Sequence, residues 1–423
     1  MFSPISSILR STSPRCRLSA LHNTPAAPRR TWTTLTRGDD ALTVHALNAT
    51  LPYVWLRDAC PSPACVHPST RQKLHRTSDI PADIAPRAGA DAVRVTPAGL
   101  EVAWADGHSS AYPRAYLERY ADPAHLARFH RDDAVRPRAW ARADVAVAPE
   151  LFVPYADVQT PAGLVRAMEQ LARYGLIFVR GVPPAKTADA ECELRALGER
   201  FGSLRTTFYG TLWDVVSLRE SRNIAYTNLD LGLHMDLLYF EHPPRYQILH
   251  CLRNRVVGGT SVFVDALHAA QTLRATHPAD FDVLTTTPVE FHYVNDGHHL
   301  HRSHPTIELT PSGEISHINY SPPFQAPLAL DTPKTFYGAL RRFADLLNDS
   351  ANTYEYTLNE GDAVLFDNRR VLHARTAFSD KEVADGSTEG EPTRWLKGCY
   401  LEADDLLDRM RVLRTKVGEE VSQ

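Results

Sequence analysis

This chain of 423 residues has few cysteines, and it lacks both long apolar stretches and an excess of basic charge. No run of 18 apolar residues occurs, which argues against a transmembrane helix. The 6 cysteines are too few to form a disulfide scaffold for a chain of this length. The formal net charge of −4 gives no reason to expect a nucleic-acid partner. The remaining composition, with 43% hydrophobic and 23% charged residues, is typical of a soluble globular protein.

Short motifs of several common enzyme classes are also missing. The chain contains no G-x-G-x-x-G or P-loop sequence, and neither G-x-S-x-G nor C-x-x-C. Its strand-like segments do not alternate regularly with helices, and no internal repeat is visible. This irregular order argues against a Rossmann sheet.

Acidic residues are absent from the first 38 positions, since the first one is Asp39. The same segment holds six arginines and many serines and threonines. An Arg-rich, Ser-rich and acid-poor N-terminus predicts a mitochondrial transit peptide, and the lack of a long apolar region disfavours a secretory signal. The alternative is a disordered basic tail on a cytoplasmic protein. In either case residues 1–38 are excluded from the predicted fold.

The rest of the chain divides into two parts. Residues 39–125 carry β-like segments with turn signals at Pro97–Gly99 and Asp106–Gly107, which predicts a small β-rich domain. A link with proline and arginine follows. Residues 140–423 mix helices and short strands and are expected to form the larger domain.

Helix and strand signals are clear in several places of the larger part. Thr160 as N-cap, Pro161 at the first position and Gly175 as stop predict one helix. Thr332 and Pro333 predict the start of a second helix in the same way. The expected strands include "GLIFVRGV", "YQILHCL", "GTSVFVDA" and "DAVLFDNRRVLHAR".

A histidine and a carboxylate interrupt the apolar segment "LGLHMDLLYFEHPPRYQILHC", residues 231–251. In the strand that this segment predicts, His234 and Asp236 face the same side. They could simply bond to each other. A third ligand from a later strand, His373, would complete the two-histidine, one-carboxylate set of non-haem Fe(II) oxygenases. The alternative is that His373 is a satisfied core histidine.

A basic residue follows at a suitable place. Arg394 in "TRWLKGCY" could hold a carboxylate near the metal through two hydrogen bonds. Its alternative is a surface charge on a strand.

A series of motifs then points to a family. They are "YVWLRDAC", "DGHSSAYP", "FYGTLW", "NIAYTN", "HMD", "QILHC", "GGTSVFVDA", "FDNRRVLHAR" and "RWLKGCY", in the family's order. With them, the chain after residue 40 resembles the γ-butyrobetaine and trimethyllysine dioxygenases, which are taurine-dioxygenase-like Fe(II)/2-oxoglutarate oxygenases. The resemblance implies a mainly β fold with flanking helices, in which a double-stranded β-helix, or jelly roll, follows a small β-rich domain. It also implies dioxygen as a reactant, ascorbate as reductant and a homodimer.

The resemblance implies roles for individual residues as well. The Fe(II) ligands would be His234, Asp236 and His373. The 2-oxoglutarate site would comprise Arg394, which meets the C5 carboxylate, together with Ser261 and Asn223. The polar insertion "SDKEVADGSTEGEPT" makes the spacing from His373 to Arg394 21 residues, longer than is usual in the family. Arg375 therefore remains an alternative partner for the carboxylate.

Four aromatic residues match the family's substrate cage: Tyr209, Trp213, Tyr226 and Tyr400. A quaternary ammonium group has no N–H donor, and aromatic faces hold it by cation–π attraction of about 0.5–2 kcal/mol per contact. The alternative for each ring is core packing. Asn319 is a weaker candidate, for a polar contact with the carboxylate end of the substrate.

The expected reaction is hydroxylation of γ-butyrobetaine to L-carnitine, favoured by the "FYGTLW", "NIAY" and "HPP" segments. The "LLYF" and "GCYLEADDLLDRMRVL" segments are closer to trimethyllysine dioxygenase, which stays an alternative together with a hydroxylase of another betaine. A metal-binding pseudoenzyme is the alternative outside catalysis. The intact set of His234, Asp236, His373 and Arg394 argues against it.

A second metal is implied in the small domain, where the family holds structural zinc with three cysteines and a histidine. Cys60, Cys65 and His108 match three of these ligands, but Ser62 stands where the middle cysteine would be. A structural zinc site normally has four ligands, so His67 or a water would have to complete it. The alternative is a pair of free cysteines without metal.

Overall fold

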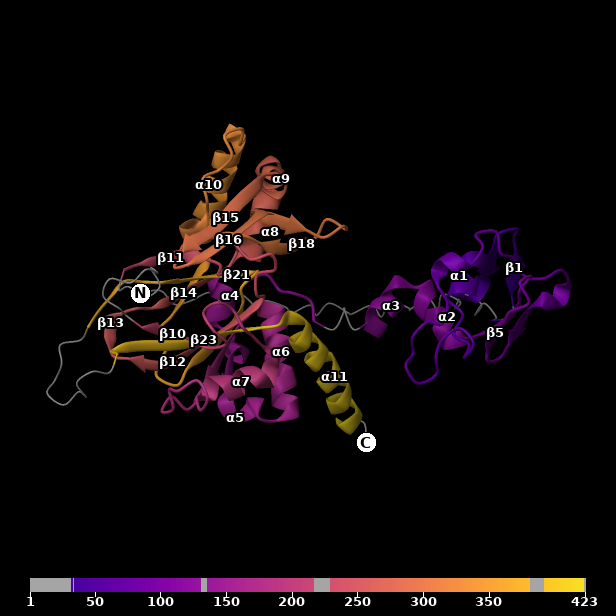
Figure 1. Ribbon diagram of the computed structural model, residues 1–423, viewed down its shortest axis with the longest axis horizontal. Helices are drawn as coiled ribbons and strands as arrows, with labels where there is room; N and C mark the ends of the chain where they lie inside the picture. Colours follow the sequence, from indigo (N-terminus) through magenta and orange to yellow (C-terminus); the bar gives the residue numbers. More distant parts are fainter. Residues whose placement is uncertain (1–31, 33, 131–134, 217–228, 381–391, 422–423) are drawn as a thin grey trace, which may run out of the picture. The chain divides into compact units, whose positions relative to one another are not determined.

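The computed structural model of the chain describes residues 32, 34–130, 135–216, 229–380 and 392–421 (Figure 1). The chain forms two compact units, Met1–Asp132 and Asp133–Gln423. Most of the predicted transit peptide lies outside the described residues. Within the described ranges, no helix is long and apolar enough to cross a membrane.

The first unit contains two three-stranded antiparallel sheets. Its strands are β1 (Leu35–Arg37), β2 (Ala41–Val44), β3 (Ala49–Pro52), β4 (Val93–Thr96), β5 (Gly99–Ala103) and β6 (Ser109–Pro113). Its helices are α1 (Tyr53–Asp58), α2 (Arg114–Ala121) and α3 (Pro123–His130). Because β1 pairs with β2, the folded part begins before the expected boundary at residue 39.

A separate apolar core holds this first unit together. Trp104 and Tyr112 are among its largest fully buried side chains. The Tyr112 hydroxyl donates to the Leu56 carbonyl at the end of α1, and the Trp104 indole N–H donates to the Ser110 hydroxyl at 2.8 Å. These bonds satisfy the polar atoms of the two buried rings.

The second unit is built on two sheets. The larger one is seven-stranded in the order β10-β23-β12-β20-β8-β7, with β9 paired to β23. Its strands are β7 (Phe152–Pro154), β8 (Leu176–Arg180), β9 (Leu204–Arg205), β10 (Trp213–Val216), β12 (Tyr246–Asn254), β20 (Ala363–Asp367) and β23 (Arg394–Leu401). The smaller sheet has the order β11-β21-β14-β19. Its strands are β11 (Leu231–His234), β14 (Ser261–Asp265), β19 (Thr353–Tyr356) and β21 (Val371–Arg375).

These two sheets pack face to face around one apolar core. Phe263 of the smaller sheet meets Phe178 and Phe366 of the larger sheet, at ring-centroid distances of 5.8 and 6.0 Å. Strands far apart in the sequence are neighbours in both sheets, as in a jelly roll. The predicted mainly β fold with flanking helices, a double-stranded β-helix after a small β-rich region, is confirmed.

The helices of the second unit form two groups, one near the larger sheet and one packed against two β-hairpins. Helices α5 (Tyr155–Val158), α6 (Pro161–Tyr174), α7 (Glu193–Phe201) and α11 (Ala403–Val421) lie near the larger sheet (Figure 1). A second apolar cluster joins α8 (Ala266–Thr276), α9 (Pro278–Thr286) and α10 (Lys334–Asn348) to the hairpins β15 (Pro288–Asn295)–β16 (His298–Pro305) and β17 (Ile307–Leu309)–β18 (Ile315–Ile318). The remaining elements are α4 (Arg142–Ala146) and the pair β13 (Val256–Gly258)–β22 (Phe378–Asp380).

The two predicted helix starts have different outcomes. Helix α6 begins as expected, because the Thr160 hydroxyl accepts the Gly163 N–H at 3.1 Å and Gly175 ends the helix with φ 70°. The prediction for α10 is wrong in detail. That helix starts at Lys334 with Pro333 as its N-cap residue, and its N-cap makes no side-chain bond. A threonine before a proline is therefore no sufficient sign of a capped start.

The N-cap of α6 gives a first test. Thr160→Ala removes the acceptor of the Gly163 N–H and is expected to lower the free energy of unfolding by about 0.5–2 kcal/mol. Thr160→Ser keeps an acceptor and should retain most of that stability. Urea unfolding of the three proteins measures the difference. Equal midpoints for the alanine and serine variants would contradict the capping role.

Candidate active site

Two histidines face each other across the smaller sheet. β11 pairs with β21 so that His234 lies opposite His373, and their rings are 4.2 Å apart between centroids. Both side chains are buried. The strand predicted over residues 231–251 is interrupted, because β11 ends at His234 and β12 begins only at Tyr246.

Asp236 lies just after β11 and not within a strand. Its carboxylate still faces His234, with Oδ1 3.4 Å from His234 Nε2. The Asn368 side chain accepts the Asp236 N–H at 2.8 Å and donates to the Asp236 carbonyl at 3.0 Å. The next residue, Leu237, has φ 61°, a backbone conformation that is costly for leucine. Asn368 thus fixes the turn that presents the carboxylate.

Hydrogen bonds orient these side chains, and their surroundings shift the pKa values of Asp236 and His373. His234 Nδ1 lies 2.8 Å from the Gly232 carbonyl and must donate to it, so Nε2 is the nitrogen that faces Asp236. Burial would raise the pKa of Asp236, but the contact with His234 and the neighbouring His373 lower it below its usual range. The Tyr400 hydroxyl adds a bond to Asp236 Oδ2 at 2.9 Å. Burial lowers the pKa of His373 to about 3. The set therefore offers the imidazoles of His234 and His373 and one ionised carboxylate.

This donor set fits a divalent metal ion. One possible ligand atom from each of His234, Asp236 and His373 lies within 4.8 Å of the other two. Nδ1 of His373 is buried without a hydrogen-bond partner. Two imidazole nitrogens and one carboxylate oxygen form the facial set that Fe(II) takes in non-haem oxygenases, with positions left open for other ligands.

A pocket with a cavity volume of about 80 Å³ opens from this triad between the two sheets. Its polar lining includes Ser261, Gln247 and two arginines, Arg375 and Arg394. Burial lowers the pKa of Arg394 to about 10, and the positive charge of Arg375 adds to this effect. Nε of Arg394 is buried with no hydrogen-bond partner. Such a pocket favours a dianionic ligand that reaches from the triad to the guanidinium groups.

The structure places three residues that were predicted from the sequence in this one pocket: Arg394, Ser261 and the alternative Arg375. Ser261 and Arg375 are cross-strand partners on β14 and β21. Arg375 donates to the Leu229 carbonyl at 2.6 Å, whereas no carboxylate other than Asp236 lines the described pocket. Asn223, the third predicted 2-oxoglutarate residue, lies outside the described residues.

Three of the four predicted cage residues are described. Trp213 lines the pocket, and its ring lies 5.3 Å from that of Tyr400 at an angle of 36°. Tyr209 follows Phe208, whose ring packs on Tyr293 at 5.2 Å. Tyr226 lies outside the described residues. Trp213 and Tyr400 therefore form an aromatic wall beside Asp236.

Asn319 has a different environment from the one predicted. Its side-chain N–H₂ donates to the Pro305 carbonyl and to Glu308 Oε1, each at 2.8 Å, and its oxygen accepts from Arg369 at 2.8 Å. It does not line the pocket described above. The amide has no free donor, and the adjoining Glu308 carboxylate would repel a substrate carboxylate. The structure gives no support to the predicted substrate contact.

Sequence reasoning missed two residues of the site. Asn368 lay inside the quoted motif "FDNRRVLHAR", but only the structure shows that it holds the Asp236 backbone and also donates to the Pro244 carbonyl at 3.1 Å. Gln247 lay in "QILHC" and lines the pocket with its buried Oε1 unpaired. A polar residue inside an apolar strand sequence was the available signal for Gln247.

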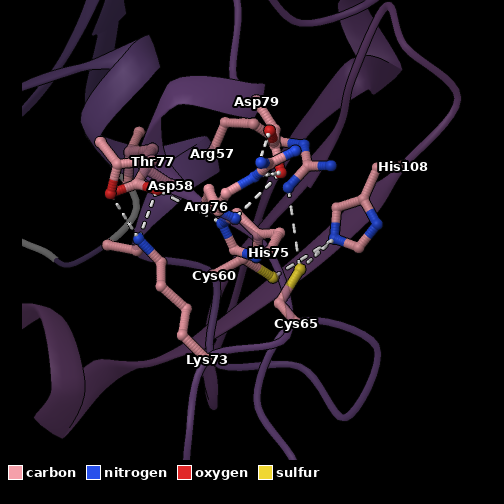
Figure 2. A network of polar contacts seen from close by, with 12 residues as sticks. Arg57, Asp58, Cys60, Cys65, Lys73, His75, Arg76, Thr77, Asp79 and His108 are labelled. Atoms are coloured by element: carbon pink, nitrogen blue, oxygen red, sulfur yellow. Dashed lines mark hydrogen bonds and ion pairs between the residues drawn. The ribbon is translucent and has the colours of Figure 1, made fainter.

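A second group of possible ligands lies in the first unit (Figure 2). His108 Nε2 is 3.4 Å from both Cys60 Sγ and Cys65 Sγ. Ser62 also belongs to this group, since Cys60 Sγ lies 3.2 Å from its hydroxyl oxygen. His67 does not, because its Nδ1 accepts the Thr70 N–H at 3.3 Å. The geometry brings two thiols, one imidazole and one hydroxyl together.

The jelly roll and the triad with its arginine-containing pocket define a class, the Fe(II)- and 2-oxoglutarate-dependent oxygenases. Comparison with known proteins agrees. The family model described as "Taurine catabolism dioxygenase TauD, TfdA family" matches residues 143–400, and the chain belongs to this family. A second model, "Gamma-butyrobetaine hydroxylase-like, N-terminal", matches residues 35–118. The protein is thus a 2-oxoglutarate-dependent dioxygenase that uses Fe(II).

Three relatives illustrate the range of the family. Dioxygenase str8 of Strobilurus tenacellus is 53% identical over 92% of this chain and 91% of its own length. Gamma-butyrobetaine dioxygenase of Pseudomonas sp. (strain AK-1) is 35% identical over 85% and 90%. Mitochondrial trimethyllysine dioxygenase of Homo sapiens is 29% identical over 85% and 82%. The predicted family resemblance is confirmed.

The triad gives a second test. Asp236→Ala removes the carboxylate ligand and is expected to prevent Fe(II) binding and to lower turnover more than about 100-fold. Iron content after anaerobic loading and succinate release from 2-oxoglutarate measure the two effects. His299→Ala, at an exposed histidine of the β15–β16 hairpin, is the matched control and should keep both. An alanine variant with full iron content and activity would exclude Asp236 as a ligand.

Proposed function

We propose that this oxygenase hydroxylates a small trimethylammonium compound, with γ-butyrobetaine as the preferred substrate and L-carnitine as the product. The observation that carries the proposal is the aromatic wall of Trp213 and Tyr400 beside Asp236. Aromatic faces attract a quaternary ammonium group, which has no N–H to offer to a polar partner. The names of the bacterial and vertebrate relatives support the same substrate class.

In this proposal His234, Asp236 and His373 hold the iron. Fe(II), when bound, couples the oxidative decarboxylation of 2-oxoglutarate by dioxygen to the hydroxylation of a substrate C–H bond. Asn368 fixes the backbone of Asp236, and the Tyr400 hydroxyl donates to its carboxylate and helps to keep it ionised and oriented.

The remaining pocket residues bind and orient the two organic reactants. Arg394 pairs with the far carboxylate of 2-oxoglutarate, and Ser261 and Arg375 lie on neighbouring strands beside it. Leu231, Leu249 and Leu396 line the same pocket and limit water around the reacting centre. Trp213 and Tyr400 place the head group of the substrate.

A second candidate is trimethyllysine, which carries the same head group on a longer chain. Relatives named for it are 28–30% identical to this chain, close to the 28–35% of those named for γ-butyrobetaine. The 53% identical relative is named only as a dioxygenase, so a third betaine is also a candidate. The three candidates share the quaternary ammonium group and differ in the carbon chain attached to it.

A side-by-side assay decides between them. We expect succinate release from 2-oxoglutarate, with Fe(II) and ascorbate, to be coupled to γ-butyrobetaine with a higher kcat/KM than to trimethyllysine. A dimethylamino analogue should react less well, because its N–H fits an aromatic wall poorly. Preference for trimethyllysine would favour the second candidate. Coupled turnover with neither compound, in protein that binds iron and 2-oxoglutarate, would contradict the trimethylammonium proposal.

We also propose that the first unit binds a structural zinc ion through Cys60, Cys65 and His108. Two thiols and an imidazole at these distances are suitable zinc ligands, and the Ser62 hydroxyl, 3.2 Å from Cys60 Sγ, is the candidate for the fourth position. A hydroxyl is a weaker zinc donor than a thiolate. The site is therefore expected to release its metal more readily than one with three cysteines.

Zinc analysis tests this site independently of catalysis. Protein purified without chelator should contain about one zinc per chain in addition to iron. Ser62→Cys supplies a third thiolate and should slow the transfer of zinc to a chromogenic chelator, whereas Ser78→Cys, at an exposed serine of the same unit, should not. A wild-type protein without zinc would mean that Cys60 and Cys65 are free thiols.

A further inference from the structure

Gly398 lies directly opposite Trp213 in the antiparallel pair of β10 and β23. Residues opposite each other in such a pair project from the same face, so each normally packs against the other's side chain. A glycine offers no side chain at that place. A glycine inside a strand weakens the strand, and its presence often marks a close approach by another group.

The approaching group is the Trp213 indole. A Cβ atom built on Gly398 would lie 2.3 Å from Cη2 of Trp213 and 2.5 Å from its Cζ2 and Cζ3. Distances this short do not occur between non-bonded carbon atoms, whose optimal separation is about 3.5–4.0 Å. The outer ring of the indole therefore lies directly on the Gly398 backbone, in the space that any other residue would fill.

This position sets the aromatic wall of the pocket. Tyr400, two residues beyond Gly398 on β23, projects from the same face and packs its ring 5.3 Å from the indole. Tyr400 in turn donates to Asp236 Oδ2 at 2.9 Å. The indole N–H of Trp213 is buried and has no hydrogen-bond partner, so the ring is placed by packing alone. Gly398, Trp213 and Tyr400 are thus packed together beside Asp236, and the Trp213 ring is the part of this group that lines the pocket.

We propose that Gly398 is a specificity-determining residue, which seats the Trp213 indole against β23 and thereby sets the width of the pocket for the substrate head group. The inference rests on the proposed function for the identity of that head group, a quaternary ammonium. A side chain at position 398 would force the ring to move by about 1–2 Å to reach a normal contact distance. Because β23 lies behind the ring, the movement narrows the pocket. The binding affinity for a bulky head group then falls more than the affinity for a small one.

The experiment is a double-mutant cycle of Gly398→Ala and Trp213→Phe. Phenylalanine is smaller than tryptophan and lacks the three atoms that contact Gly398, so alanine at position 398 should be tolerated in that background. We expect Gly398→Ala alone to raise the KM for γ-butyrobetaine about 3- to 30-fold, which corresponds to a lost cation–π contact. The KM for 2-oxoglutarate should stay unchanged, and the dimethylamino analogue should be affected less.

Thermal unfolding of the wild type, the two single variants and the double variant measures the steric contact between positions 398 and 213 without any substrate. Gly398→Ala should lower Tm by about 2–8 °C in the wild-type background and by much less beside Trp213→Phe. Gly338→Ala is the matched control, since that glycine lies exposed on α10 with open space around it. It should leave Tm and both KM values equal or slightly improved.

The results distinguish the contact with Trp213, the role in specificity and the proposed substrate. If Gly398→Ala lowers Tm or prevents folding equally in both backgrounds, the glycine does not act through Trp213 and the inference is wrong. Coupling in Tm together with an equal loss for both head groups would contradict the role in specificity. Absence of turnover with every trimethylammonium compound, while the Tm coupling is present, would contradict the proposed substrate and leave the seating of the indole intact.

Discussion

The pairing of β11 with β21 is the constraint on which the site depends. It sets His234 opposite His373, while on its other side β21 pairs with β14 and places Arg375 opposite Ser261. The side chains of a strand alternate between its two faces, so a slip of one residue in this register would turn His373 and Arg375 away from the pocket together. One strand therefore aligns a histidine of the triad with a guanidinium of the ligand pocket. The burial of Phe263 and Leu372 in the cores on either side opposes such a slip.

The buried charges of the pocket differ in whether they have partners within the protein. The Asp236 carboxylate accepts a hydrogen bond from the Tyr400 hydroxyl and lies 3.4 Å from His234 Nε2, while Asn368 holds the Asp236 backbone. The guanidinium of Arg394 packs over the Phe378 ring at 5.3 Å, and its Nε is without a partner. A buried cation without an anion destabilises the folded state. A ligand that binds only the folded state raises the free energy of unfolding. An oxygenase loaded with iron and 2-oxoglutarate is thus expected to be more stable than the free chain.

Local signals in the sequence predicted the parts of the fold that depend on local physics. Thr160, Pro161 and Gly175 determined the two ends of α6 because capping acts within one turn. The end of β11 at His234 was missed, since it depends on Asn368, which lies 132 residues beyond Asp236 in the chain. Asn319 was assigned to the substrate because its nearest partners, Glu308 and Arg369, become neighbours only after folding. A single sequence does not show which distant segments come into contact, so these partners could not be predicted.

The most direct test of the account is an anaerobic titration of the Fe(II)-loaded protein with 2-oxoglutarate, followed by the visible absorption of the iron–keto-acid complex. One equivalent of 2-oxoglutarate per chain should saturate the absorption. Arg394→Ala should bind as much iron as the wild type but should need about 30- to 1,000-fold more 2-oxoglutarate, as expected for the loss of a buried charged contact. An unchanged titration midpoint in Arg394→Ala, or no absorption in iron-loaded wild-type protein, would contradict an oxygenase centre that extends from the triad to Arg394.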